Sequence, residues 1–328
     1  MSNGPAVTIC IPAWQAEDFI EKTLDCATSQ DYENIRILVS IDQSNDATAE
    51  ICRRYAARDN RLSVHVHEER LGWVGNVNFL LDLVETELFF IYFHDDIILP
   101  AYISRLVLEL QDHPEAGSVH CDMGHFGATE HVSVGRANTG CCAQRMAEFL
   151  IVPERGSPLR SITRTSLLKQ GLRLPRLVSG GLWANEPYLL HLMALGTALH
   201  VPEVLYMRWN RRKGGLTDGW RAFSAEDFLG AYRGNVEASL QVIRSVSLQD
   251  WEQEALVFCL YLASLKHLWA ECQSRGAVGR IRPEEVSPAF QNLTLPQHLG
   301  RFTGDVEQWI LRRAKEMEES LNASGTIQ

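Results

Sequence analysis

The first half of the chain alternates short apolar stretches with amphipathic ones, and this alternation restricts the fold more than any other feature. Residues 6–12, 34–42, 62–67 and 87–93 are rich in the β-branched and aromatic side chains typical of strands. Between them, residues 16–30, 44–59 and 74–85 place apolar side chains at helical spacing. Strands that alternate with helices in this way predict an α/β fold with a mostly parallel sheet flanked by helices.

Ligands of such sheets bind beyond the carboxyl ends of the strands, so the residues at those ends are candidates for a site. An aromatic side chain follows the first strand, and polar side chains follow the others. We expect these residues to lie together along one edge of the sheet: Pro12, Ala13, Trp14, Asp42, Gln43, Ser44, Asn45, Glu69, Arg70, Leu71, Gly72, His94, Asp95 and Asp96.

The adjacent acids Asp95 and Asp96 directly follow the apolar stretch FFIYF. Burying an unpaired carboxylate costs several kcal/mol, so a positive group should meet this pair, or the pair should lie at a solvent-filled edge. Hard cations such as Mg²⁺ and Mn²⁺ prefer oxygen ligands and bind through one or two carboxylates together with substrate phosphates. The alternative is that Asp95 caps the following helix and Asp96 is solvated.

The composition of the chain excludes some classes of function. The chain has 328 residues and a net charge of −10, which argues against sequence-independent binding to nucleic-acid phosphates. We find no apolar run that would span a membrane and no signal peptide, so we expect a cytoplasmic protein whose eight cysteines are reduced thiols. Cys141 and Cys142 are adjacent: either they are two thiols in a loop, or they have a redox or metal-binding role.

Four strings, in this order, resemble the nucleotide-sugar-binding half of inverting glycosyltransferases of family 2: VTICIPAWQAEDFIEKTL, ILVSIDQSNDAT, LGWVGNVN and FHDDIILP. The resemblance covers about residues 6–210. It implies a GT-A fold, a UDP-sugar donor, a hydroxyl acceptor, and Mn²⁺ or Mg²⁺ as cofactor. It also implies that Asp96 holds the metal and that Asp95 contacts the ribose or a metal-bound water. The other implied nucleotide contacts are the strand-end residues Pro12, Ala13, Trp14, Asp42, Ser44, Gly72 and His94, with Glu17, Asn76 and Asn78.

The chain departs from the family pattern at three places near the expected nucleotide. Trp14 replaces a tyrosine, and an indole can still stack on a base. Ile41 stands where the family often has an aspartate that contacts uracil, which leaves the base specificity open. Phe93 stands at the first position of the family's acidic string, so only the Asp95–Asp96 pair remains.

The resemblance also implies a general base in the second half, within the string WANEPYLL. Glu186 takes that role, and Asn185 replaces its usual acidic neighbour. The dipole at a helix start should keep Glu186 ionised. The alternative is an ordinary first-turn acid before Pro187.

A basic stretch follows in the string WNRRKGGLT. By the same resemblance, Arg211, Arg212 and Lys213 belong to a loop that closes over the diphosphate, with two glycines as hinges. The alternative is a solvated basic loop, which is the usual role of such a charge run.

We expect a catalytic domain over residues 1–220 and a helical C-terminal extension over 221–328. The extension could pack on the core, form a homodimer or contact a membrane surface. The acceptor, whether a glycan, a lipid-linked molecule or a small molecule, has no signature. Two alternatives remain: a nucleotidyltransferase acting on sugar phosphates, although the first strand lacks the glycine-rich basic loop such enzymes need, and a nucleotide-sugar-binding protein without turnover.

Overall fold

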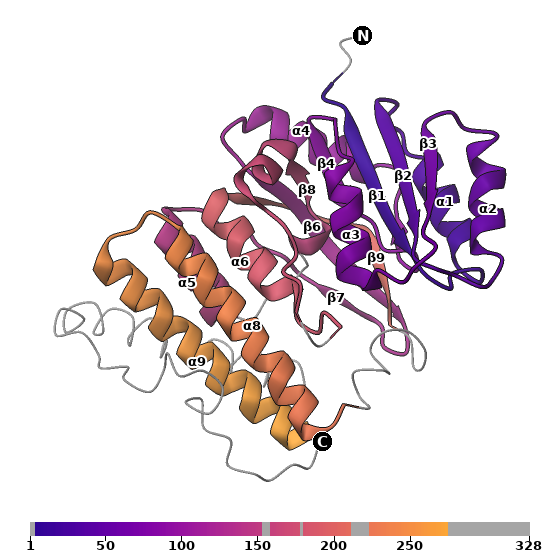
Figure 1. The fold of residues 1–328 in the computed structure, drawn as a ribbon. Coiled ribbons are helices and arrows are strands. Elements are labelled where there is room, and N and C mark those ends of the chain that lie inside the picture. The colour runs from indigo at the N-terminus through magenta and orange to yellow at the C-terminus, as the bar shows by residue number, and fades with distance from the viewer. Residues whose placement is uncertain (1–3, 153–157, 178–179, 211–222, 275–328) are drawn as a thin grey trace. The chain divides into compact units, whose positions relative to one another are not determined.

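The computed structural model describes residues 4–152, 158–177, 180–210 and 223–274. Its first strands are β1 (Val7–Ala13), β2 (Ile35–Ile41), β3 (Leu62–Val66) and β4 (Leu88–Ile91). They are parallel, as predicted: β1 lies between β2 and β4, and β2 pairs with β3 (Figure 1). Their carboxyl ends therefore lie along one edge of the sheet, where a ligand site is expected.

Later strands extend the sheet beyond β4: β5 (Ile97–Ile98), β6 (Ser118–Gly127), β7 (His131–Ser133), β8 (Ile162–Arg164) and β9 (Ala198–Asn210). The strand order is β3-β2-β1-β4-β8-β6-β9-β5, with β7 paired to β6. β8 runs antiparallel to β4 and β6, whereas β6 and β9 are parallel. Because β5 directly follows the acid pair and joins β9, it brings the end of β9 to that pair.

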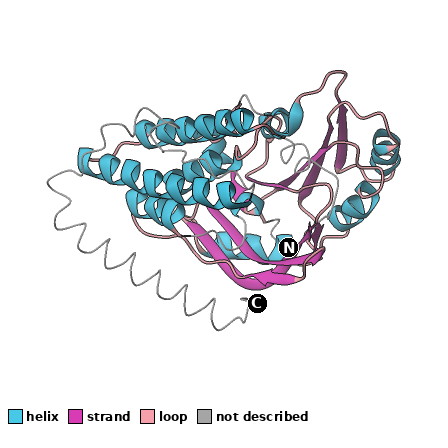
Figure 2. Cartoon of the chain, turned by 90° about the horizontal axis from the view of Figure 1, so that it is seen from below, coloured by secondary structure: helices cyan, strands magenta, loops and turns pink. Residues whose placement is uncertain are grey.

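Helices lie on both sides of the strands (Figure 2). They are α1 (Ile20–Thr28), α2 (Thr48–Ala56), α3 (Gly72–Asp82), α4 (Tyr102–Asp112), α5 (Cys142–Ile151), α6 (Asn185–Leu195) and α8 (Ala225–Ser245), with short 3-10 helices η1 (Pro158–Arg160) and η2 (Thr165–Gln170). A further helix, α9 (Asp250–Ser274), follows α8 in the chain. The predicted α/β class with a mostly parallel, helix-flanked sheet is confirmed.

The side chains of β4 alternate between two apolar cores, because successive strand residues point to opposite faces. Leu88 and Phe90 join one core with β1, α1, α2 and α4. Phe89 and Ile91 join the other core with α3 and α6. An apolar run that is buried on both faces is what a central parallel strand requires.

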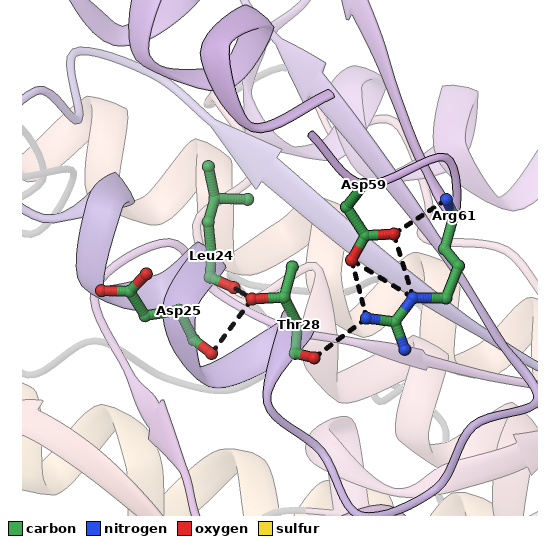
Figure 3. Close-up of polar contacts among 5 residues, drawn as sticks. All are labelled: Leu24, Asp25, Thr28, Asp59 and Arg61. Atoms are coloured by element: carbon green, nitrogen blue, oxygen red, sulfur yellow. Dashed lines mark hydrogen bonds and ion pairs between the residues drawn. The ribbon is translucent and has the colours of Figure 1, made fainter. Parts of the chain in front are cut away.

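Arg61 joins the segment before β3 to the end of α1 (Figure 3). Its Nη2 atom donates to the carbonyl of Thr28 at 2.9 Å and pairs with Oδ2 of Asp59 at 2.6 Å. The hydrogen bond from Arg61 lowers the pKa of Asp59 below its ordinary value. The Thr28 hydroxyl bonds to the carbonyl of Leu24, which closes the last turn of α1. These contacts fix the position of α1 relative to the neighbouring strands.

The chain divides into two compact units, Met1–Val246 and Ser247–Gln328. The sequence places the start of the helical extension at residue 221, whereas α8 contacts α6 and belongs to the first unit. The second unit contains α9. Among the described helices, none has both the length and the apolar character that crossing a membrane would require.

Candidate functional site

The loops that follow β1 and β2 are joined by hydrogen bonds. The backbone amide of Gln15 donates to Oγ of Ser44 at 2.9 Å, and the amide of Ala47 donates to Oε2 of Glu17 at 3.0 Å. Gln15 has a φ of 45°, in a region that few residues other than glycine adopt. Glu17 and Ser44 therefore brace the two loops, and their contacts with a nucleotide stay predictions.

Trp14, Asp42 and Arg70 form a layered contact at the ends of the first three strands. The buried carboxylate of Asp42 accepts from Nε of Arg70 at 2.9 Å and from the amide of Leu71 at 2.6 Å. The guanidinium carbon of Arg70 lies 3.6 Å from the ring centroid of Trp14, in cation–π geometry. A base that stacks on Trp14 would use the other face of the indole or displace Arg70. The sequence places all three residues at this edge but assigns no role to Arg70, although its place after the third strand is a visible signal.

Backbone groups complete this edge of the sheet. The amide of Asp42 donates to the carbonyl of Ala13 at 2.9 Å, and Nδ1 of His94 lies 3.0 Å from the carbonyl of Pro12. Gly72 begins α3 with a φ of 70°, which glycine adopts without strain. These residues lie at the strand ends where the sequence places them.

The two asparagines of α3 have backbone partners. Nδ2 of Asn76 donates to the carbonyl of Ser40 at 3.0 Å. Nδ2 of Asn78 donates to the carbonyl of Leu174 at 2.9 Å, while its Oδ1 accepts from the amide of Leu174 at 3.1 Å. Asn78 therefore joins α3 to the segment that precedes α6. This position does not fit the predicted nucleotide contact, because both ends of the amide are used within the protein.

Asp96 is buried and paired with an arginine. Its side chain is 2% exposed, and its Oδ2 accepts from Nε of Arg160 at 3.0 Å and from the hydroxyl of Tyr206 at 2.8 Å. Its Oδ1 accepts from the amide of Trp209 at 3.1 Å. Burial lowers the pKa of Arg160, but Asp96 and Tyr206 together more than offset this effect and hold that pKa above its ordinary value. The positive group that a buried carboxylate requires is therefore Arg160.

This arrangement does not fit Asp96 as a metal ligand. Both carboxylate oxygens face donors of the protein, and a cation there would lie against a guanidinium of the same charge. The alternative of a solvated Asp96 does not fit either, because the residue is buried. The neighbouring carboxylate of Asp95 is only partly buried at the end of β4. Within the described ranges, no three His, Cys, Asp or Glu side chains form a ready-made metal site.

Two arginines that the sequence leaves without a role stand beside the acid pair. The guanidinium carbon of Arg160 lies 4.8 Å from the ring centroid of Phe93, the residue at the family's first acidic position. Burial and the charge of Arg160 lower the pKa of Arg208, whereas Asp96 and Asp95 act in the opposite direction. The acid pair is thus accompanied by two cations. The sequence predicts that a buried carboxylate needs a positively charged partner, but it does not show that Arg160 is this partner.

The turn before α6 packs against the start of α3. Nε1 of Trp73 donates to the carbonyl of Gly181 at 3.2 Å, and a Cβ on Gly181 would lie only 2.5 Å from that nitrogen. Gly180, Gly181 and Trp183 all have positive φ values, of 64°, 83° and 60°. For a bulky residue such as Trp183, this conformation costs about 1–3 kcal/mol. Trp73 follows Gly72, so the turn that leads to Glu186 contacts the same helix start as the Asp42–Arg70 pair.

Glu186 lies in the first turn of α6. Burial raises its pKa from 4.5 to about 7, although a hydrogen bond from Asn235 acts in the opposite direction. The sequence suggests that the dipole of α6 keeps this group ionised, whereas burial favours its neutral form. A carboxylate with a pKa near the working pH is well suited to accept a proton. Arg211, Arg212 and Lys213, predicted to close over the diphosphate, lie outside the described residues.

The fold is shared with solved nucleotide-sugar transferases. The structure of S. aureus TarS 1–349 in complex with UDP-GlcNAc matches with a TM-score of 0.65 and 18% identity, over 85% of this chain and 77% of that chain. The mannosyltransferase PcManGT from Pyrobaculum calidifontis, in complex with GDP-Man and Mn²⁺, matches with a TM-score of 0.55 and 18% identity over the same shares. The fold class is therefore GT-A, in agreement with the prediction.

Residues 8–166 match the family described as Glycosyl transferase family 2. An uncharacterized glycosyltransferase of Haemophilus influenzae is 30% identical over 115 residues, which are 34% of this chain and 36% of that protein. Glycosyltransferase GlyA of Streptococcus pneumoniae is 35% identical over 66 residues, which are 20% of this chain and 9% of that protein. The chain thus spans about a third or less of the length of these relatives, and the family resemblance is confirmed.

Proposed function

We propose that this protein transfers a sugar from a nucleotide-diphosphate sugar, with UDP as the preferred nucleotide, to a hydroxyl acceptor with inversion at the anomeric carbon. Glu186 is the general base. The observation that carries this proposal is the partly buried Glu186 carboxylate, whose pKa is about 7, on a turn that packs against the nucleotide-side helix α3. TarS binding UDP-GlcNAc and PcManGT binding GDP-Man support a nucleotide-sugar donor.

In this mechanism the acceptor oxygen attacks the anomeric carbon from the face opposite the diphosphate. Its proton passes to the carboxylate of Glu186, the bond between the acceptor oxygen and the carbon forms, and the carbon–phosphate-oxygen bond breaks. The nucleoside diphosphate leaves with the electron pair. Removal of a proton by one positioned base contributes about 10²–10⁴-fold to such a step.

We propose that Trp14 stacks on the base, with Asp42 and Arg70 beside it at the same strand ends. Their mutual contacts keep the indole and the guanidinium in fixed positions before a nucleotide arrives. Because Ile41 replaces an acid of the family, a uracil here would be held by fewer polar contacts than in a typical relative.

A divalent cation would be held by Asp95 and by oxygens of the donor's diphosphate, since a hard cation often uses one or two carboxylates plus substrate phosphates. When bound, it would offset the negative charge of the leaving diphosphate. Asp96 instead has a structural role, because it pairs with Arg160 and accepts a hydrogen bond from the end of β9.

The experiment that tests the transfer is a paired measurement on Glu186→Gln. The amide keeps the shape and hydrogen bonding of the side chain but cannot accept a proton. Donor turnover, measured as slow hydrolysis if no acceptor is known, should fall about 10²–10⁴-fold, while donor affinity by calorimetry stays within about threefold. Equal loss of both would make Glu186 a donor-site or structural residue. A parent protein that binds donors but turns none over would favour the binding-protein alternative.

A further inference from the structure

Helix α8 buries a polar side chain on the face that it packs inward. That face is formed at helical spacing by Phe228, Tyr232, Asn235 and Ser239. Asn235 is 3% exposed. Burying an amide is unfavourable unless its donors and acceptor find partners, so the partners of Asn235 show what this position is used for.

Asn235 bonds to both the main chain and the side chain of the segment that contains the proposed base. Its Nδ2 donates to the carbonyl of Trp183 at 2.9 Å, and the same carbonyl accepts the backbone amide of Glu186 at 2.9 Å. A second hydrogen bond joins Asn235 to the Glu186 side chain. Both N–H donors of an asparagine side chain are on Nδ2, so one hydrogen meets the carbonyl and the other meets the carboxylate.

Helix α8 also contacts Trp183, the residue with a strained backbone in the turn before α6. The ring of Trp183 lies edge-on to Phe228 at 5.2 Å and to Tyr232 at 5.6 Å, measured between ring centroids. Trp183 has a φ of 60°, and such a conformation persists only where the surroundings enforce it. Two aromatic contacts and one hydrogen bond from α8 provide that constraint.

We propose that Asn235 is a positioning residue for Glu186, which orients the carboxylate and favours its ionised form while it fixes the turn that begins α6. This inference rests on the proposed role of Glu186 as the base. Asn235 acts through Glu186. A hydrogen bond donated to a carboxylate favours the charged form, which burial opposes. Glu186 is thereby shielded from water, and the hydrogen bond from Asn235 still allows it to ionise near neutral pH.

Two variants test this role. Asn235→Leu keeps the branched shape of the side chain but removes both donors, and Asn235→Asp also places a second negative charge beside the base. In both variants we expect kcat to fall by about 10- to 100-fold, with the donor dissociation constant within about threefold. The inflection of the pH–rate profile should move to higher pH, and further in the aspartate variant, because a like charge disfavours ionisation.

The matched control is Ser239→Ala, which removes a buried polar side chain from the same face of α8 one turn further along. It should leave the pH–rate profile unchanged. A purely structural role of Asn235 would predict instead that both Asn235 variants lose stability while the inflection stays in place.

A second readout does not need turnover. With ¹³C-labelled glutamate carboxyls, the signal of Glu186, assigned by its loss in Glu186→Gln, should titrate at higher pH in Asn235→Leu than in the parent. An unchanged titration in a folded variant would overturn the positioning role, whatever the activity. A shifted titration in a parent that turns over no donor would support the contact between Asn235 and Glu186 and reject the proposed function alone.

Discussion

Nε and Nη2 of Arg160 each lie 3.0 Å from Oδ2 of Asp96, and the carboxylate they bind is 2% exposed. This pair explains why a buried strand ends on two adjacent acids. One acid is neutralised inside the protein and joins η1 to the end of β9, whereas the other remains partly exposed beside the proposed nucleotide site.

Removal of Asp96 should therefore act on stability. Breaking a buried ion pair by removing one partner typically costs about 3–5 kcal/mol, because the other charge is left unpaired. We expect Asp96→Asn to lower the free energy of unfolding by roughly this amount, measured by urea denaturation with and without Mn²⁺. Asp95→Asn is the matched control and should change stability by less than about 0.5 kcal/mol. Equal stability of Asp96→Asn and the parent would rule out an energetic role for the pair.

The same two variants separate the candidates for a metal ligand. If a divalent cation tightens UDP binding, Asp95→Asn should remove that effect, because an amide is a poorer ligand for a hard cation. Calorimetric titrations of UDP with Mn²⁺ and with EDTA give the comparison. A full Mn²⁺ effect in Asp95→Asn would exclude Asp95 as the ligand. Equal UDP affinities in the parent under both conditions would exclude a cation from the donor site.

Trp14 should contribute stacking to nucleotide binding. Stacking of a base on an aromatic side chain is worth about 1–3 kcal/mol, so Trp14→Ala should weaken UDP binding about 5- to 100-fold. Trp14→Phe keeps an aromatic face and should lose less than the alanine variant. A folded Trp14→Ala protein with parent affinity would contradict the stacking of the base on Trp14.

Asn78 offers the opposite test, in which stability changes and binding does not. Its side chain makes two hydrogen bonds to the backbone of Leu174, at 2.9 and 3.1 Å. Asn78→Ala should lower the free energy of unfolding by about 1–3 kcal/mol and leave UDP affinity unchanged. A loss of affinity at full stability would restore the nucleotide contact that the sequence implies.

Glu186 should make stability depend on pH in a defined window. Its pKa is raised from 4.5 to about 7, so between these values the folded protein keeps a proton that the unfolded chain has released. The folded state then binds more protons, and its stability falls as the pH rises through the window. Relative to Glu186→Gln, the parent should lose stability from about pH 4.5 to pH 7 and change little above it. The measurement is a series of urea unfolding curves on both proteins, and parallel pH dependences would contradict the raised pKa.

The sequence by itself determined the order of strands and helices, the parallel sheet and the edge at which polar residues gather. These features follow from periodicity within short segments, because a strand repeats its side-chain direction every second residue and a helix at 3.6. Trp14, Asp42, Gly72 and Asp95 lie at or within two residues of the end of a predicted strand or the start of a predicted helix, so their positions could be inferred without knowing what they touch.

Only the tertiary structure decided which partners these residues have. Arg160 is 64 positions from Asp96, Leu174 is 96 positions from Asn78, and Asn235 is 52 positions from Trp183. Contacts between such distant segments leave no periodic signal, since they depend on how helices and strands pack. The same holds for the pKa of Glu186: the sequence shows that this residue lies at a helix start, but the burial that raises its pKa comes from the surrounding fold.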